Sequence, residues 1–537
     1  FENIAAEVNE AEKHGYTRTA GINPDLKKYF LEKEAMEAGL TIAYESVVTG
    51  VYIDGKKVAG VKWFREGSFK NTGSKIVIDC TAEAEVCDLA GCETHKGRDV
   101  DSQCQPYTNI LVTRKENRVI CRNTDCGYVD QTDGEELSRA LIESSTLPLH
   151  LRDTYDAAER LLYLTQHLGV REGRAVVGEE NITLKECLED KVTDKPLFFS
   201  YSNIDNHGKD VAFESELLQD WLVVCSLFGI NLSVPVPMGA IIPKGYDGIL
   251  AAARHLAADH DIASLVRMKR DIQKCGEAAA IVAYAAVKIG CKIKDVPYDY
   301  ILPLLKENKC LNEENNIKMK EAASTDDTEN QKIDWMNDKE EIQRLLSSDK
   351  PGIAIWSCRR MNEKISADLT RWLSDENENL KRNSALALGL LGDRRALPVL
   401  RRMAAEKDAF MPKTRRKYNH PRGLAAVYLL GKLRDRASLS ELKELILGGE
   451  DQLNIEACEF IEDNGEYYFH YYIHALMALI KIGGRYPEKR DEIAEAIHKS
   501  FGRKGFSLHI NLKAGNRQNY DMTAKVKEIA LKLIREW

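Results

Sequence analysis

The chain has 537 residues, several times the length of one ordinary domain, so we expect two or three domains that each bury a core. Charged residues make up 30% of it and the formal net charge is -8, a mildly acidic balance that favours neither nucleic acid nor an anionic membrane as a partner. Its longest apolar runs are too short to span a bilayer. Thirteen cysteines without a Cys-x-x-Cys pair indicate reduced thiols and a cytoplasmic location, and any targeting segment would precede Phe1.

The first 96 residues are predicted to contain helices, a β-meander and a strand followed by a helix. A helical pattern runs to about residue 40 and is broken by a turn at residues 21–24. Residues 41–48, 51–53 and 57–63 are rich in β-forming side chains, with the hairpin pair Asp54-Gly55 between them. A buried strand at 75–79 and a helix at 83–90 follow, an order that is typical of cofactor-binding units.

Residues 97–233 have an irregular pattern, which predicts an inserted α+β domain that carries the substrate face. We expect a strand at 107–113 and a helix at 153–167 within it. Apolar density returns in residues 234–305, with a strand at 248–253 and a helix of small residues after Arg267. Residues 306–340 are rich in Asn, Lys and Glu and cannot bury much apolar surface, so they are predicted to be a charged linker.

The last part of the chain, residues 341–537, contains an internal repeat. Four positions recur 42 residues later (431 minus 389): Gly389, Asp393, Leu397 and Leu400 return as Gly431, Asp435, Leu439 and Leu442. Each unit is expected to be a helix pair that buries its apolar face only against its neighbours. The pattern resembles HEAT repeats and predicts an all-α domain whose concave surface binds a protein partner. The basic residues 413–417 are expected to form an exposed loop rather than to bind nucleic acid.

Four stretches of the first 305 residues carry further motifs. They are residues 22–26 with the meander that follows, the run Ile78-Asp79-Cys80-Thr81-Ala82-Glu83, the segments 171–174 and 201–207, and the segment 241–280. In this order they resemble the bacterial-type FAD-dependent oxidoreductase family, related to the fumarate reductase and glutathione reductase flavoproteins. The resemblance implies an α/β fold in which a Rossmann-like FAD-binding domain, residues 1–96 and 234–305, holds the inserted domain. Ala82, Glu83, Ala253 and Ala280 depart from the Gly, Asp, Gly and Gly of the family pattern.

The resemblance also implies FAD as the cofactor and a set of residues that contact it. The adenine would meet main-chain atoms near Val48, and Arg254 and Arg267 would meet ribityl or phosphate oxygens, unless they pair with Asp247, Asp259 or Asp261. Small side chains at 276–280 would let the helix backbone approach a planar ligand, with N-terminal amides that favour negative charge. The predicted cofactor-binding residues are Val48, Asp79, Thr81, Ala82, Glu83, Arg254, Arg267, Gly276, Glu277, Ala278 and Ala279.

The predicted catalytic residues are His207, Tyr201, Arg171 and Arg174. His207 and Tyr201 would transfer protons while a hydride moves to or from the flavin, or His207 is a loop residue with a structural hydrogen bond. One of the two arginines would clamp a carboxylate of a small-molecule substrate, or pair with an acid such as Glu179. His255 and His260 flank acidic residues, but they lack a further ligand pattern such as H-E-x-x-H, so we predict no metal.

The glycine-rich loop G-x-G-x-x-G between a strand and a helix does not occur in the sequence. In the family this loop precedes all four stretches and binds the diphosphate, so we expect it to lie before Phe1 and the chain to be incomplete for FAD binding. The predicted function is an FAD-dependent oxidoreductase that transfers a hydride, or two electrons, between a small organic substrate and flavin. The repeats are predicted to dock or regulate this enzyme. The alternative is a degenerate flavoprotein-like scaffold whose helical repeats bind a partner protein.

Overall fold

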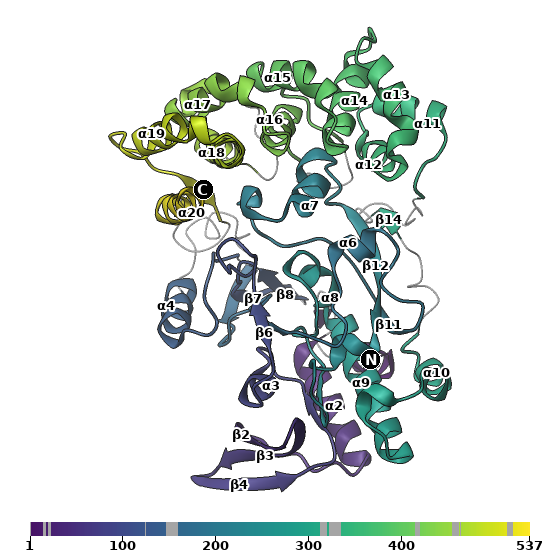
Figure 1. Ribbon diagram of the computed structural model, residues 1–537. Coiled ribbons are helices and arrows are strands. Elements are labelled where there is room, and N and C mark those ends of the chain that lie inside the picture. The colour runs from purple at the N-terminus through teal and green to yellow at the C-terminus, as the bar shows by residue number, and fades with distance from the viewer. Residues whose placement is uncertain are drawn as a thin grey trace.

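The computed structural model describes residues 2–13, 18–19, 23–116, 118–123, 125–145, 159–311, 319–321, 334–413, 419–453, 461, 463–512 and 519–537. Within these ranges a part of mixed helices and strands precedes an arch of helices, which lies across the top of the molecule in Figure 1. None of the described helices combines the length and the apolar character that crossing a membrane requires.

The chain begins with two helices and a three-stranded meander. The helices are α1 (Glu2–Lys13) and α2 (Pro24–Glu37), with the short β1 (Arg18–Thr19) between them, and the side chain of Asn23 caps α2 by accepting from the backbone of Asp25 at 3.1 Å. The meander consists of β2 (Val47–Asp54), β3 (Lys57–Arg65) and β4 (Ser68–Gly73), all antiparallel. It confirms the predicted hairpin. The strand predicted for residues 41–48 is wrong up to residue 46, where the backbone turns at Glu45 with a φ of 53°.

Two predicted strands from distant parts of the sequence pair with each other. They are β5 (Val77–Asp79) and β13 (Ile249–Ala251), which run parallel with Asp79 opposite Ala251. The short helix α3 (Glu85–Leu89) follows β5, and the long helix α9 (Lys269–Ile289) follows β13 after α8 (Ala263–Val266). Because parallel strands present their carboxyl ends at one edge, the loops after β5 and β13 lie together there.

Three small sheets make up most of the described part of the region that is predicted to be an inserted domain. The first has the order β1-β8-β7-β9, with β7 (Ile110–Lys115), β8 (Arg118–Asn123) and β9 (Glu159–Leu164). The second pairs β6 (Thr94–Lys96) with β10 (Arg174–Val176), and the third has the order β11-β12-β14, with β11 (Pro196–Asn203), β12 (Ile230–Pro237) and β14 (Met319–Glu321). The helices of the region are α4 (Gly134–Ser145), α6 (Leu184–Leu188) and α7 (Glu216–Gln219), followed by a π-helical turn, η2 (Asp220–Val224).

The helix predicted for residues 153–167 is wrong where the structure describes it. Residues 159–164 form β9, which pairs antiparallel with β7, whereas residues 151–158 lie outside the described ranges. The local pattern is helical, but β7 offers backbone partners that override it. In the predicted linker, α10 (Tyr298–Glu307) extends into its first residues, β14 joins the third sheet and α11 begins at Lys339.

The helical arch confirms the predicted repeat. Its helices are α11 (Lys339–Leu346), α12 (Gly352–Met361), α13 (Glu363–Trp372), α14 (Glu378–Leu390), α15 (Leu397–Ala405), α16 (Arg422–Lys432), α17 (Leu439–Leu447), α18 (Asn464–Arg485), α19 (Arg490–Phe501) and α20 (Thr523–Arg535), with a hairpin of β15 (His509–Asn511) and β16 (Asn519–Asp521) before α20. A Cβ added to Gly389 of α14 would lie 2.8 Å from Leu429 of α16, and one on Gly431 of α16 would lie 2.6 Å from Ala478 of α18. The repeated glycine therefore lets successive helices pack closely.

The inner helices of the arch pack on the rest of the chain. Trp356 of α12 stacks edge-on against Trp221 of η2, with ring centroids 5.0 Å apart. Lys432 and Tyr428 of α16 both bond Asp220, at 2.6 and 2.7 Å. The concave surface that the sequence assigns to a protein partner is thus covered, along α12 and α16, by the chain itself (Figure 1).

Candidate functional site

The loop after β5 is held by the side chain of Asp79. One carboxylate oxygen accepts from the backbone and the hydroxyl of Thr81, at 2.9 and 2.6 Å, and the other accepts from the backbone of Cys87 at 2.9 Å. The Thr81 hydroxyl in turn accepts from the backbone of Glu85 at 2.9 Å. Burial opposes the charged carboxylate, but His255 and these hydrogen bonds together lower the pKa of Asp79. Asp79 and Thr81 therefore fix the loop, with Ala82 exposed at its tip.

Glu83 joins this loop to two of the predicted arginines. Its carboxylate pairs with Arg254 and accepts from the backbone of Arg174 at 3.3 Å, while its carbonyl accepts from the Arg174 side chain at 2.9 Å. Arg174 also pairs with Asp88 of α3 at 2.7 Å. Burial raises the pKa of Glu83 although Arg254 acts against it. Arg174, predicted to be a substrate clamp, is thus bound to the loop and to α3.

Arg171 and His207 meet at Asp125, a residue that the sequence did not single out. Asp125 accepts from Arg171 at 2.5 Å and lies 3.3 Å from Nδ1 of His207, whose Nε2 lies 3.3 Å from Asp205. Burial disfavours charge on both groups, but the hydrogen bond between them and their further partners lower the pKa of Asp125 to about 2 and raise that of His207. The two carboxylates therefore favour the protonated form of His207.

Arg267 and Arg254 carry unpaired donors beside this group. The Nε–H groups of both are buried and have no hydrogen-bond partner among the described residues, although Arg267 donates from Nη2 to the carbonyl of Asp205 at 2.8 Å. Burial, together with repulsion from Arg171 and Arg254, lowers the pKa of Arg267 to about 10. Three guanidinium groups thus lie near one another, an arrangement that suits the oxygens of an anion. We call Arg171, Arg254 and Arg267 the arginine cluster.

Tyr201 lies apart from the arginine cluster. Its backbone on β11 accepts from Arg270 at 2.9 Å and donates to Asp271 at 3.2 Å, which docks the first turn of α9 on the strand. In the described part of the chain no hydrogen bond or ion pair joins its side chain to His207. The structure brings together Arg171 and His207 but not Tyr201.

Helix α9 corrects one expectation about the flavin side. It begins at Lys269, so the amides of residues 276–280 lie inside the helix and not at its N-terminus, and the predicted attraction of those amides for negative charge is wrong. Gly276 faces open space, with no atom within 4 Å of an added Cβ, whereas Glu277 lies 4.0 Å from the thiol of Cys310. Ala278 and Ala279 are fully buried, and Val48 is half-buried in β2 opposite Trp63.

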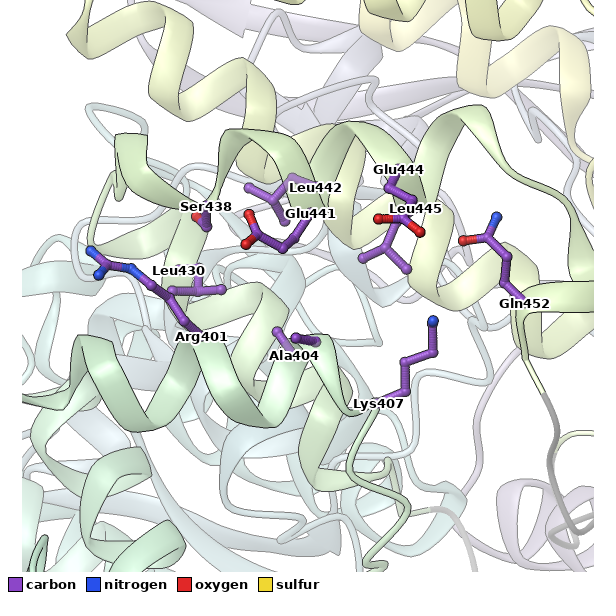
Figure 2. Close-up of a pocket in the computed structure, with 11 residues that line it drawn as sticks. Arg401, Ala404, Lys407, Leu430, Ser438, Glu441, Leu442, Glu444, Leu445 and Gln452 are labelled. Atoms are coloured by element: carbon purple, nitrogen blue, oxygen red, sulfur yellow. The ribbon is translucent and has the colours of Figure 1, made fainter.

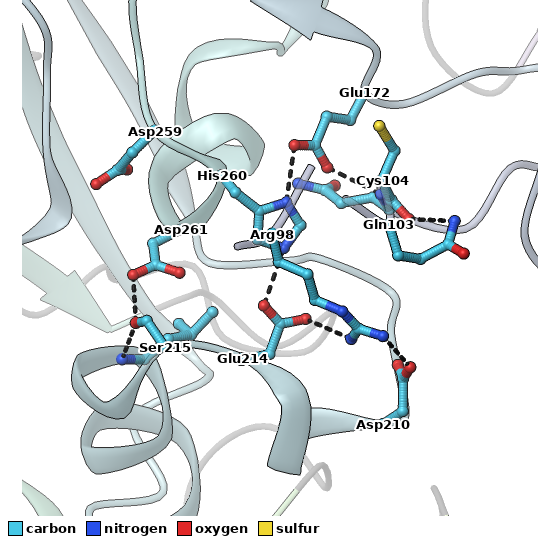
Figure 3. A network of polar contacts seen from close by, with 12 residues as sticks. Arg98, Gln103, Cys104, Glu172, Asp210, Glu214, Ser215, Asp259, His260 and Asp261 are labelled. Carbon is cyan, nitrogen blue, oxygen red and sulfur yellow. Dashed lines mark hydrogen bonds and ion pairs between the residues drawn. The ribbon is translucent and has the colours of Figure 1, made fainter. Parts of the chain in front are cut away.

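A second polar network lies between the two parts of the chain. Figure 3 shows His260 between Glu172 and Glu214, at 2.8 and 2.9 Å, and Arg98 pairs with Asp210 at 2.6 Å. Burial opposes a charged His260, but the two carboxylates raise its pKa well above the usual value. Arg98, Glu214 and His260 border a cavity of about 280 Å³ that Met477 and Lys481 of α18 also line. Since Glu172 follows Arg171 directly, the network lies next to the arginine cluster.

A smaller hollow lies on the repeats. It has a volume of about 90 Å³. Figure 2 shows side chains of α15 and of the turn after it on one side, among them Arg401 and Lys407, and side chains of α17 on the other, among them Glu441 and Glu444. Pockets for cofactors usually have volumes of about 300–1,000 Å³, so this hollow is too small for a flavin.

Comparison with known proteins agrees with this architecture. The FAD dependent oxidoreductase family matches residues 1–119 and 108–305, and HEAT repeats match residues 342–415. The first match spans more than half of the chain, so the chain belongs to the FAD-dependent oxidoreductase family, and it carries HEAT repeats in its helical arch. The comparison with curated proteins found no match.

Proposed function

We propose that the protein binds FAD and transfers a hydride, or two electrons, between a small organic substrate and the flavin. The family match supports the reaction class, and the arginine cluster beside His207 supports this part of the structure as the binding site. Bound FAD would supply the redox chemistry, while the protein would set position and charge. The free thiols of the described cysteines support a reducing compartment, which we take to be the cytoplasm.

The observation that carries the proposal is the pair of unpartnered Nε–H groups on Arg254 and Arg267. A buried donor without a partner costs about 1–3 kcal/mol, and an anionic oxygen would satisfy it. Such an oxygen would also relieve the repulsion that lowers the pKa of Arg267. The open space at Gly276 would let a planar group approach the backbone of α9. These residues fit an anionic cofactor or the carboxylate of a substrate.

His207 is the proposed proton donor of the site. Asp125 and Asp205 hold its two ring nitrogens, so a protonated ring has both N–H groups placed. Arg171 shares Asp125 with it and would orient a substrate carboxylate near the ring. Tyr201 would take part only if substrate binding brought its side chain to the same place.

A specific contact favours the alternative of a scaffold without cofactor. Glu83 stands where the family pattern has Asp, and its carboxylate fills the space beside Gly173, where a Cβ added to that glycine would collide with the carboxylate. The same carboxylate pairs with Arg254, so it occupies an arginine that would otherwise be available to a cofactor. The covered inner face of the repeats bears on the same alternative, because a partner would have to use the outer helices α13, α15, α17 and α19, where the hollow of Figure 2 lies.

Flavin binding by the purified protein separates the two functions. We expect the purified protein to retain a flavin absorbance spectrum, and Arg267→Met to weaken FAD binding by about 10- to 100-fold, because a charge-assisted hydrogen bond is lost. The matched control is Arg270→Met on the same segment, whose guanidinium pairs with Asp271 at 2.9 Å. Titration calorimetry with FAD gives both affinities. A folded protein that binds no FAD would favour the scaffold, and an equal loss in both variants would show that the Arg267 guanidinium does not bind the cofactor.

A further inference from the structure

Three residues of different types meet at the edge where β5 and β13 end. They are Asp79, Cys87 and His255, and their ligand atoms all lie within 4.8 Å of one another. Asp79 ends β5, His255 follows β13 by four residues, and Cys87 lies on α3. Each is at most 1% exposed.

His255 provides a second, independent observation. Its side chain is completely buried, and neither ring nitrogen makes a hydrogen bond that meets normal geometry within the described residues, although the backbone of Thr81 lies near enough to be a weak partner. The carboxylate of Asp79 lies 4.0 Å from Nε2, too far for a direct hydrogen bond. Buried polar groups almost always have a partner, so an imidazole within 4.8 Å of a carboxylate and a thiol without a good hydrogen bond to either points to a missing ligand.

The donor set selects the kind of ligand. A carboxylate oxygen, a thiolate sulfur and an imidazole nitrogen together are ligands of Zn²⁺, whereas Mg²⁺ and Ca²⁺ prefer oxygen alone. A thiolate, a carboxylate and a neutral imidazole balance the two positive charges of the ion, so the buried site would carry no net charge. Binding would release the proton of the Cys87 thiol to solvent.

We propose that Asp79, Cys87 and His255 bind a zinc ion. The sequence predicted no metal because the three residues lie far apart in the chain and match no spacing motif. The ion joins the loop after β5 to the loop after β13, and these loops carry Glu83 and Arg254. It therefore helps to hold Arg254, one member of the arginine cluster, in place.

The test measures metal content and metal spectra, neither of which depends on flavin. Protein purified without chelator is expected to contain about one zinc ion per chain by mass spectrometry of the elements. After removal of the zinc, added Co²⁺ is expected to give the absorbance of a tetrahedral thiolate complex. Cys87→Ser and His255→Asn are each expected to abolish the cobalt–thiolate band and to lower the zinc content at least about tenfold.

Matched controls separate loss of the site from loss of the fold. Cys358→Ser changes an equally buried thiol in the arch, and His420→Asn changes a buried histidine there, so both are expected to keep the metal. Circular dichroism checks that each variant is folded. A folded parent protein with neither zinc nor a cobalt–thiolate band, or zinc retained at the parent level in Cys87→Ser and His255→Asn, would overturn the proposal.

Discussion

Asp125 is the residue on which the candidate site depends most, because it pairs with two basic side chains. Arg171, 6% exposed in its side chain, has Asp125 as its ion-pair partner, and His207, 23% exposed in its side chain, bonds the same oxygen. Replacing Asp125 by Asn leaves both basic groups without that negative charge. We predict that Asp125→Asn lowers the free energy of unfolding by about 3 kcal/mol at mildly acidic pH, as loss of one partner of a buried pair does.

The pH dependence of this loss follows from the two pKa shifts. The pKa of Asp125 is lowered to about 2, so its contribution is present above its normal value and is lost as the pH falls through about 2. The pKa of His207 is raised above 6.5, so its contribution is present below 6.5 and is lost as the pH rises through the higher folded value. Urea unfolding should thus show a larger difference between parent and variant near pH 5.5 than near pH 9.

The control for Asp125→Asn is Asp88→Asn, which removes the negative charge of a half-exposed carboxylate that pairs with Arg174. We expect it to change stability by less than about 1 kcal/mol. Equal losses in the two variants, or a loss at Asp125 that does not depend on pH, would show that the buried pair does not act as described.

At this same scale the sequence found some of the site and missed the rest. The family motifs, which follow one another in a fixed order along the sequence, contain Arg171, Arg254, Arg267 and His207. Asp125 lies in a loop 46 residues before Arg171 and belongs to no motif, so only the folded chain shows that it contacts Arg171 and His207. From the sequence, His260 is considered only as a metal ligand, and its ion pairs with Glu172 and Glu214 cannot be predicted because these partners come from separate segments.

At the scale of elements, the close packing of α16 on α18 depends on Gly431. An added Cβ would lie 2.6 Å from both Cα and Cβ of Ala478, and the backbone of a packed helix cannot move aside easily. We predict that Gly431→Ala lowers the free energy of unfolding by about 1–3 kcal/mol, despite the better helix propensity of alanine. Urea unfolding followed by circular dichroism measures it.

Gly484, near the end of α18, provides the matched control. It is exposed, and an added Cβ would meet its nearest neighbour, Trp537, at 3.8 Å, an ordinary contact. Gly484→Ala should therefore leave stability unchanged or raise it by up to about 1 kcal/mol. If the two alanines had the same effect, close packing would not explain why glycine recurs at 389 and 431.

Elements that rest on local pattern were predicted well, and those that rest on distant partners were not. The meander has its own turn and the repeat its own helix periodicity, so both follow from neighbouring residues. The helix of small residues predicted after Arg267 is likewise observed, as α9 from Lys269. β9 is a strand because β7, some 50 residues earlier, offers backbone partners, and this cause is not visible in the segment itself.

At the scale of the whole molecule, the arch and the oxidoreductase part share a buried ion pair. Asp220 is 1% exposed in its side chain, and Lys432 of α16 bonds both of its oxygens, at 2.6 and 2.7 Å. The other groups near it are the Tyr428 hydroxyl and Arg359, at 3.8 Å. Through this contact and the Trp221–Trp356 stack, unfolding of one part exposes the other, so we expect a single calorimetric transition for the parent chain.

Lys432→Met should lower the free energy of unfolding by about 3–5 kcal/mol, because it leaves the buried carboxylate of Asp220 without enough positive charge nearby. Calorimetry should then show a lower transition temperature and a transition that broadens or splits into two. The second change Asp220→Asn, added to Lys432→Met, should restore part of the loss, since the uncompensated charge is gone. Lys443→Met, which removes the half-exposed pair with Glu492, should cost less than about 1 kcal/mol. Two separate transitions in the parent chain, with neither moved by Lys432→Met, would mean that the repeats are an independent module and that their inner face is free for another protein.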